Sequence, residues 1–218
     1  MVLAIHHRTQ EARRAETRAA ILAAAANAFG QAGLAGARTD AIAAAAGVNK
    51  AMLYYYFKSK QQLFEAVIED NFEEFNSRAL ALLASPGSAR SVLLRYVDLH
   101  FDFISSRHRY ARIHQQMMMT GGKAFERLVR KYFVPRNEAL DRLLERGMAA
   151  GEFRPMDRRH TAISIIALIV FYFSAAPVLN VLGQSDAYSP ASLQERKDEV
   201  LNFIRHAVFR RPGDPMKI

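Results

Sequence analysis

Cysteine and tryptophan are both absent from this chain of 218 residues, and only seven residues are proline. Without cysteine the chain forms no disulfide and no thiolate metal site, so its composition does not point to an oxidising compartment. The apolar run near the amino terminus is too short for a secretory signal peptide, and we expect a cytoplasmic protein. Segments with the alternating period of a strand are missing too, which favours an all-α fold.

Motifs of the common enzyme classes are missing as well. The sequence has no glycine-rich phosphate loop, no Gly-x-Ser-x-Gly elbow and no His-Glu-x-x-His pair. His100 and His114 each lack a second ligand four residues further on, so we interpret both as hydrogen-bonded helix residues. We therefore expect no enzymatic activity, no cofactor and no metal site.

The chain is rich in alanine, in hydrophobic side chains and in positive charge. Half of the residues are hydrophobic, which is enough for a substantial core, and the alanine content favours helix. The formal net charge is +9, of which residues 1–70 carry +2 and the remainder +7. A positive protein is steered towards nucleic acid, but this distribution does not by itself locate a DNA-binding site.

Residues 38–60 have the pattern of a helix-turn-helix unit. Gly47 follows a short helical pattern and can adopt the positive φ of a sharp turn. Asn49 suits the N-cap of a second helix, and Val48 and Leu53 have the spacing of a hydrophobic staple around it. This spacing holds one face of the second helix against the domain and leaves the other for the major groove of DNA.

The outward face of the second helix carries Lys50, Ala51, Tyr54 and Tyr55. Tyrosine hydroxyls and lysine bind phosphate oxygens, and short residues let a helix approach the base edges. Two tyrosines are unfavourable on a face that only meets water, so we interpret this face as DNA-binding. The alternative, that the aromatic run belongs to the core, fits Tyr56 better than its two neighbours.

The string from Phe29 to Leu63 resembles the DNA-binding domain of the TetR family of bacterial transcriptional repressors. It includes Ala-Gly-Val at 46–48 and Leu-Tyr-Tyr-Tyr-Phe-Lys-Ser-Lys at 53–60. The resemblance implies phosphate contacts from three residues and contacts at or near the bases from four more. Met52 replaces a hydroxyl residue common in the family, and position 38 offers a charged contact in place of a neutral one. The predicted DNA interface consists of Arg38, Thr39, Asp40, Asn49, Lys50, Ala51, Tyr54, Tyr55 and Lys60.

Two domains are expected. The three-helix DNA-binding unit should span residues 14–74, and a larger helical domain for dimerisation and ligand binding should span residues 75–210. Apolar residues from Leu63 to Phe75 recur at spacings of three and four, which predicts a helix that joins the two domains.

Three stretches interrupt the helical pattern. Residues 1–15 are polar, and we expect them to be frayed, with arginines that could reach the DNA backbone. Ser-Pro-Gly-Ser at 85–88 is the clearest break in the chain. Pro135 must begin, kink or interrupt the helix around it, since proline removes a helical hydrogen bond.

Residues 161–182 form a nearly continuous apolar run. Its length approaches that of a transmembrane helix, although polar residues and Pro177 interrupt it. A helix that is apolar all round is alternatively buried on every side, which in a small domain requires a partner chain. We therefore expect a homodimer without membrane insertion, in which this helix and residues 189–209 form a four-helix interface. The predicted interface residues are Ile166, Ile169, Val170, Phe173, Val200, Ile204 and Val208.

Methionines and aromatic residues of the second domain suggest an apolar effector pocket. Methionine adapts to irregular apolar ligands, although any single one of these residues could simply belong to the core. Arg127, Arg130 and Lys131 could attract an anionic effector, but a solvated helix face is the commoner explanation for such charges. The predicted pocket residues are Phe101, Ile104, His114, Met117, Met118, Phe171 and Tyr172.

Three functions remain open at this point. The first is a homodimeric repressor that leaves a palindromic operator when a small, largely apolar effector binds. The second is a DNA-binding regulator whose second domain only dimerises or binds a protein partner. The third is a membrane-attached regulator that uses residues 161–182.

Overall fold

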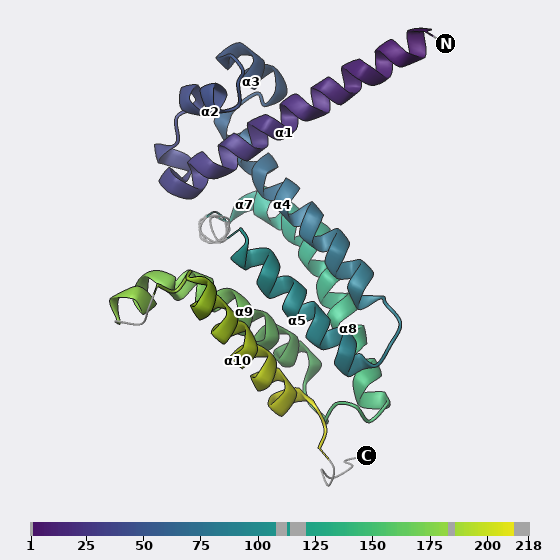
Figure 1. Cartoon of the computed structure of the whole chain (residues 1–218). Helices are drawn as coiled ribbons and strands as arrows, with labels where there is room; N and C mark the ends of the chain where they lie inside the picture. The colour runs from purple at the N-terminus through teal and green to yellow at the C-terminus, as the bar shows by residue number, and fades with distance from the viewer. Residues whose placement is uncertain (1, 108–112, 114–120, 183–185, 212–218) are drawn as a thin grey trace.

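The computed structural model describes residues 2–107, 113, 121–182 and 186–211, with the side chains of residues 2–9 and Ala124 left out. Within these ranges the chain is helical and contains no strand, and a single antiparallel bridge joins Phe153 to Phe209. The predicted all-α fold is therefore confirmed. Figure 1 shows α2 and α3 at one end of the molecule, beside α1, and the helices of the second part packed together at the other.

The amino-terminal unit consists of α1 (Val2–Gly36), α2 (Thr39–Ala45) and α3 (Lys50–Tyr56). Gly33 lies at φ +67°, and it marks the break at which the regular part of α1 ends. The expectation that residues 1–15 are frayed is wrong, because α1 begins at Val2. Residues 10–20 within it are rich in alanine, arginine, glutamate and glutamine, which are good helix formers. The unit's core includes Ile21, Ala25, Phe29, Ile42, Leu53, Phe57, Leu63 and Phe64.

Helix α4 (Lys60–Leu83) joins the two parts of the molecule. Its first turns pack into the amino-terminal core through residues that end with Phe72, and Phe75 begins its contacts with the second core. One continuous helix thus follows α3 at one end and packs into the second part of the molecule at the other (Figure 1).

The second part packs α5 and α8 beside α4, with α9 and α10 beyond α5 (Figure 1). Its core gathers side chains from α4, α5, α8, α9 and α10, among them Tyr96, Leu140, Ile165 and Ile204. The helices in this part are α5 (Ala89–Ser105), α7 (Gly122–Leu128), the π-helical turn η1 (Val129–Phe133), α8 (Val134–Ala149), α9 (Arg158–Val181) and α10 (Pro190–Val208).

Pro135 explains the π-helical turn that precedes it. Proline has no N–H for the carbonyl four residues earlier and its ring would crowd that carbonyl, so the helix widens before it. The turn η1 ends at Phe133, and Pro135 lies in the first turn of α8. The prediction that Pro135 begins or interrupts this helix is confirmed.

Gly147 lets the end of α8 pack against the chain that follows. A Cβ atom at this position would meet the ring of Phe153, which is buried and stacks on Phe209 with ring centroids 5.7 Å apart. The glycine is required by this close approach rather than by its backbone angles.

Candidate DNA interface and effector pocket

The turn between α2 and α3 is built as its sequence predicts. Gly47 lies at φ +68°, and the backbone N–H of Val48 donates to the carbonyl of Ala43 at 3.0 Å. Asn49 caps α3, because its side-chain oxygen accepts the N–H of Met52 at 2.8 Å. Leu53 is fully buried beneath this turn and anchors α3 to the domain. The orientation of α3 therefore follows from local interactions.

The outward face of α3 carries the four residues predicted for it. Lys50, Ala51 and Tyr54 are exposed, and the side chain of Tyr55 is 71% exposed. Tyr56 is half-buried and packs against the amino-terminal core, as the core alternative for it requires. This arrangement exposes two tyrosines and a lysine on one surface.

Two interactions join α2 to α3 across this surface. Lys50 Nζ lies 2.8 Å from Asp40 Oδ1, and the hydrogen bond between them lowers the pKa of Asp40 and raises the pKa of Lys50. The Tyr54 hydroxyl donates to Thr39 Oγ1 at 3.4 Å, a weak hydrogen bond. The predicted base-reading and phosphate-binding residues thus lie side by side, with the charge of Lys50 already balanced by a carboxylate.

Lys60 has a structural partner that the sequence did not reveal. Its ammonium donates to the carbonyl oxygens of Ala35 at 3.1 Å and Ala37 at 3.0 Å, where α1 ends. A cation is favourable at a helix carboxyl terminus, so this contact accounts for a lysine in the first turn of α4 without invoking a phosphate. Ser59, the residue before it, caps α4 by accepting the N–H of Gln62 at 3.1 Å.

Most of the predicted dimer interface is wrong. Five of its members are buried in the second core of their own chain and are not available to a partner: Ile169, Phe173, Val200, Ile204 and Val208. Ile166 and Val170 are half-buried. The error arises because α9 is apolar on all sides, and sequence spacing alone does not say which side packs inwards.

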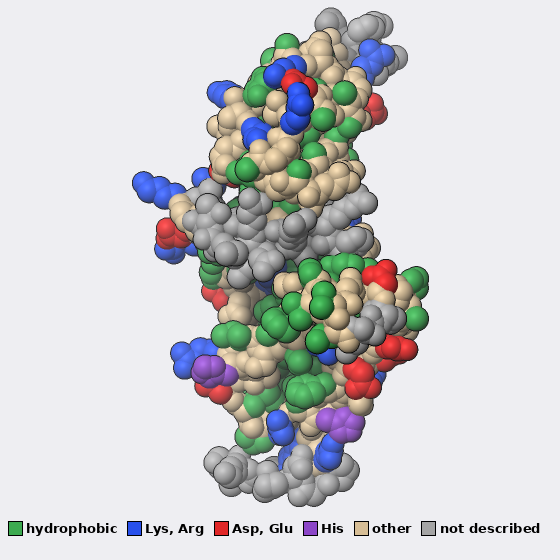
Figure 2. All heavy atoms as spheres, turned by 90° about the vertical axis from the view of Figure 1, so that its left-hand side faces the viewer, with side chains coloured by type: hydrophobic (Ala, Val, Ile, Leu, Met, Phe, Trp, Pro, Cys, Tyr) green, Lys and Arg blue, Asp and Glu red, His purple; other side chains and the backbone are tan. Residues whose placement is uncertain are grey.

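A different set of apolar side chains on α9 and α10 is exposed. Val181 is 87% exposed and Phe171 is 69% exposed. Figure 2 shows hydrophobic side chains gathered over the lower half of the face it presents. We call the following residues the α9–α10 apolar face: Ile163, Phe171, Val178, Val181, Leu182 and Phe203.

By length and composition, two of the described helical segments could cross a membrane: Gln10–Gly36 and Arg158–Val181. Core helices of globular proteins meet the same criterion. In α9, Ala162, Ile165 and Ala176 are buried against the chain's own core. One side of this helix thus packs as a core helix does, and the opposite side is the α9–α10 apolar face.

None of the described members of the predicted effector pocket lines either of the two hollows described below. Phe101 is buried and packs against Phe173, with ring centroids 5.2 Å apart, and Phe171 belongs to the exposed face. Ile104 is half-buried beside the core, and the Tyr172 hydroxyl donates to the carbonyl of Ala187 at 2.8 Å. The remaining three predicted members, His114, Met117 and Met118, lie outside the described residues.

A pocket of about 410 Å³ lies instead between α5, the end of η1, α8 and α9. It is mostly apolar, and a buried arginine, Arg136, forms part of its wall. The sequence offered one signal for this residue, because Arg136 shares its helical spacing with Leu140, Leu143 and Gly147, all buried. The full lining is Tyr96, Phe133, Val134, Arg136, Asn137, Glu138, Leu140 and Ile166.

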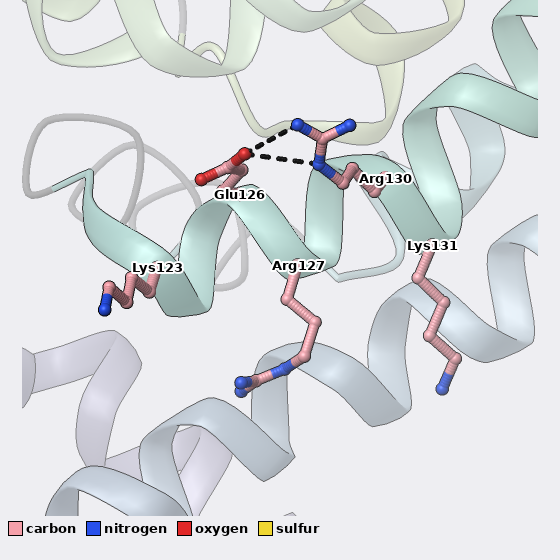
Figure 3. Close-up of a pocket in the computed structure, with 5 residues that line it drawn as sticks. All are labelled: Lys123, Glu126, Arg127, Arg130 and Lys131. Atoms are coloured by element: carbon pink, nitrogen blue, oxygen red, sulfur yellow. Dashed lines mark hydrogen bonds and ion pairs between the residues drawn. The ribbon is translucent and has the colours of Figure 1, made fainter.

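A second hollow, of about 490 Å³, lies on the surface of α7 and η1 (Figure 3). Its lining includes the three cations that the sequence offered for an anionic effector, but each has a carboxylate partner. Arg130 pairs with Glu126 on the same helix, as Figure 3 shows. The other two pairs cross to α4: Arg127 to Glu65 at 3.3 Å, and Lys131 to Glu69 at 2.8 Å. The two pairs that cross to α4 connect it to α7 and η1.

Tyr132 strengthens this connection from the inside. Its buried hydroxyl donates to Glu73 of α4 at 2.7 Å, and its ring stacks on Phe72 with centroids 5.9 Å apart. Burial raises the pKa of Tyr132 to about 12, so the hydroxyl stays a donor at neutral pH. Pairing with Lys131 lowers the pKa of Glu69, which keeps that ion pair charged.

A helix-turn-helix unit with an aromatic and basic outer face, carried on a helix that continues into a separate helical domain, defines the class of helix-turn-helix regulators. Family models agree with this class. The model of bacterial regulatory proteins of the tetR family matches residues 21–67, and a tetracyclin repressor-like carboxyl-terminal domain matches residues 90–204. The chain belongs to the TetR family of bacterial regulatory proteins.

Individual relatives support this assignment over the whole length. The transcriptional repressor NicS of Pseudomonas putida is 31% identical over 218 residues, which covers 93% of this chain and 94% of the relative. The regulator YttP of Bacillus subtilis is 22% identical and covers 90% of this chain and 96% of its own.

Solved structures share the fold. A Saccharomonospora viridis transcriptional regulator in complex with choline has a TM-score of 0.74 at 22% identity, covering 90% of this chain and 100% of its own. FadR of Bacillus subtilis in complex with stearoyl-CoA has a TM-score of 0.68 at 21% identity, covering 85% of this chain and 96% of its own.

Proposed function

We propose that the chain is a homodimeric transcriptional repressor that binds a palindromic operator and is released from it by a small-molecule effector. The observation that carries the proposal is the outward face of α3, on which Lys50, Tyr54 and Tyr55 are exposed while Asn49 and Leu53 fix the helix to its domain. Residues of these types bind phosphate oxygens and base edges. The repressor named NicS, which is similar over nearly the full length, supports the direction of regulation.

Homodimer formation is supported by the α9–α10 apolar face. Exposed apolar patches of this kind on a protein surface commonly mark an interface. In a two-fold dimer, the α9–α10 apolar face of one chain packs against the same surface of its partner. The two copies of α3 can then contact the DNA together. A palindromic operator would be matched when these helices lie about 34–36 Å apart, or a multiple of that distance.

Effector-controlled release is supported by the connection between the pocket and α4. Phe133 lines the pocket, and its ring lies 4.9 Å from that of Phe72 on α4. The next residue back, Tyr132, donates to Glu73 on the same helix. A ligand that displaces η1 would therefore displace α4, the helix that follows α3. Such an effector would prefer one of two conformations, which differ in the separation of the two α3 helices of the dimer. A difference in affinity of about 1–3 kcal/mol is typical of such coupling.

Footprinting on DNA upstream of the protein's own gene tests the proposal. A symmetric protected site is expected, and binding should weaken as salt rises, because phosphate contacts release counterions. Absent or salt-independent binding would contradict the DNA-binding role.

The runner-up function is a DNA-binding regulator whose second domain only dimerises or binds a protein partner. Such a domain needs no ligand pocket, so the pocket beside Arg136 favours effector control. A membrane-attached regulator is tested by size-exclusion chromatography without detergent, where the proposal expects a single dimer peak.

A further inference from the structure

Arg136 is a buried cation that forms no ion pair with the residues that the structure describes. Its side chain lies in the first turns of α8, and the residue is only 4% exposed. Among the described residues, no carboxylate forms an ion pair with it, and its Nη1 atom has no hydrogen-bond partner. Arginine remains protonated in proteins, so the positive charge stays in the interior.

Aromatic rings surround the guanidinium but do not neutralise it. Its central carbon lies 5.0 Å from the ring centroid of Phe75 and 4.9 Å from that of Phe133. These cation–π contacts offset part of the desolvation cost. The buried hydroxyl of Tyr96 also lies at this cation, yet its oxygen has no hydrogen-bond partner of good geometry. The cluster is therefore arranged around a charge that it leaves uncompensated.

The same cation lines the 410 Å³ pocket, which is otherwise largely apolar. Val134, Leu140 and Ile166 provide its apolar lining, and Tyr96 and Asn137 add neutral polar groups. The one carboxylate in the lining, Glu138, is more than half exposed and lies 3.9 Å from Arg142 rather than at Arg136. A volume of this size is within the range of small-molecule sites.

We propose that this pocket binds a small apolar carboxylic acid, whose carboxylate pairs with Arg136 while its body contacts the apolar lining. A planar guanidinium can donate two parallel hydrogen bonds to a carboxylate, and such pairs gain strength where water is excluded. A water molecule could satisfy Nη1, whereas only an anion also balances the charge. That the acid acts as the effector rests on the function proposed above.

The position of the site gives the ligand a route to the DNA-reading unit. Phe133 contacts the guanidinium on one side and Phe72 of α4 on the other. Drawing Arg136 towards a carboxylate changes the packing of Phe133, and with it the contact between η1 and α4. The ligand-free and ligand-bound states thus differ in the packing of α4, which begins directly after the helix-turn-helix unit.

The binding test uses hexanoate and benzoate as probes, with hexanamide and benzamide as uncharged partners of the same shape. Isothermal titration calorimetry on the full-length protein should show the acids binding about 10- to 100-fold more tightly than the amides, since a hydrogen bond to a charged group is the stronger kind. Equal binding of acid and amide, or no binding of either acid, would overturn the proposal.

Variants at Arg136 locate the site. Arg136→Met keeps an unbranched stem in place of the arginine stem and removes the charged guanidinium, so it should lose the preference for acids. Arg146→Met removes an exposed charge from the same helix and should keep that preference. Arg136→Lys keeps the positive charge but lacks the two parallel N–H donors of the guanidinium, so it should bind the acids with intermediate affinity. A preference for acids that survives in Arg136→Met would refute the assignment.

The stability of the protein without ligand distinguishes a ligand-binding role of Arg136 from a structural one. If Arg136 serves a ligand, replacing it by methionine should leave the urea midpoint unchanged or raise it, because an uncompensated buried charge is removed. A lower midpoint would mean that the guanidinium stabilises the fold itself, and would count against the proposal.

Operator binding distinguishes this proposal from the function on which it rests. If the acids bind through Arg136 but leave operator affinity unchanged, the site stands and effector-controlled release fails. If operator DNA binds and the acids do not, the regulator stands and the carboxylate site fails.

Discussion

Replacing Asn49 by aspartate should separate the folding of α3 from its binding to DNA. The side-chain oxygen of Asn49 accepts the N–H of Met52 at 2.8 Å, and aspartate caps helices as well as asparagine does. The first turn of α3 contains no acidic residue, so a new carboxylate there also gains about 0.3–1 kcal/mol from the helix dipole. The free energy of unfolding should therefore stay the same or rise.

The same substitution places a negative charge on the surface proposed to face phosphates. Two unit charges about 5 Å apart repel by about 1–3 kcal/mol at effective dielectric constants between those of water and a protein surface. A dimer presents the change twice, so operator affinity should fall by about 30-fold or more.

Urea unfolding and fluorescence anisotropy with operator DNA measure the two effects separately. Asn49→Ala is the comparison for the cap, and it should lose about 1 kcal/mol of stability. Gln194→Glu on α10 makes the same change of charge far from α3 and should bind operator as the unchanged protein does. An Asn49→Asp protein with normal operator affinity would refute the placement of α3 against DNA.

Three further substitutions test the Asp40–Lys50 ion pair, the exposed apolar face and the packing at Gly147. Asp40→Asn frees Lys50 from its ion pair with Asp40, in which the pKa of Asp40 is lowered. Non-specific DNA affinity should rise and the slope of log affinity against log salt should steepen by about 1 per protomer; an unchanged slope would count against the pair. Phe171→Glu on the exposed apolar face should convert the dimer into a folded monomer on sizing with unchanged circular dichroism, whereas a dimer that persists would remove this residue from the interface. Gly147→Ala should destabilise by about 1–3 kcal/mol in urea despite the better helix propensity of alanine, because the new Cβ meets Phe153; a more stable protein would contradict the close packing.

The helix-turn-helix unit was predictable because its determinants are local. Gly47 needs a positive φ, Asn49 caps the helix that follows it, and Leu53 anchors that helix four residues later. Each of these interactions spans only a few residues, so spacing in the sequence is enough to recognise it. The family resemblance rests on the same residues.

The second domain was harder to predict because its side chains take their roles from distant helices. Residues of α9 are apolar on every side, and only the packing of α5 and α8 decides that Ile169 and Phe173 face inwards while Phe171 faces outwards. Arg136 has the spacing of a core position, but its charge hid that signal, since arginine is seldom buried without a partner. Lys60 likewise gained its partner from α1, more than twenty residues away.

The central claim is that two copies of the chain present two α3 helices to one palindromic site. Sedimentation equilibrium with a fluorescent duplex carrying the protected sequence measures this directly. We expect two chains per duplex, bound cooperatively, and loss of tight binding when the spacing between half-sites is changed by half a helical turn. One chain per duplex, or affinity that does not depend on half-site spacing, would contradict it.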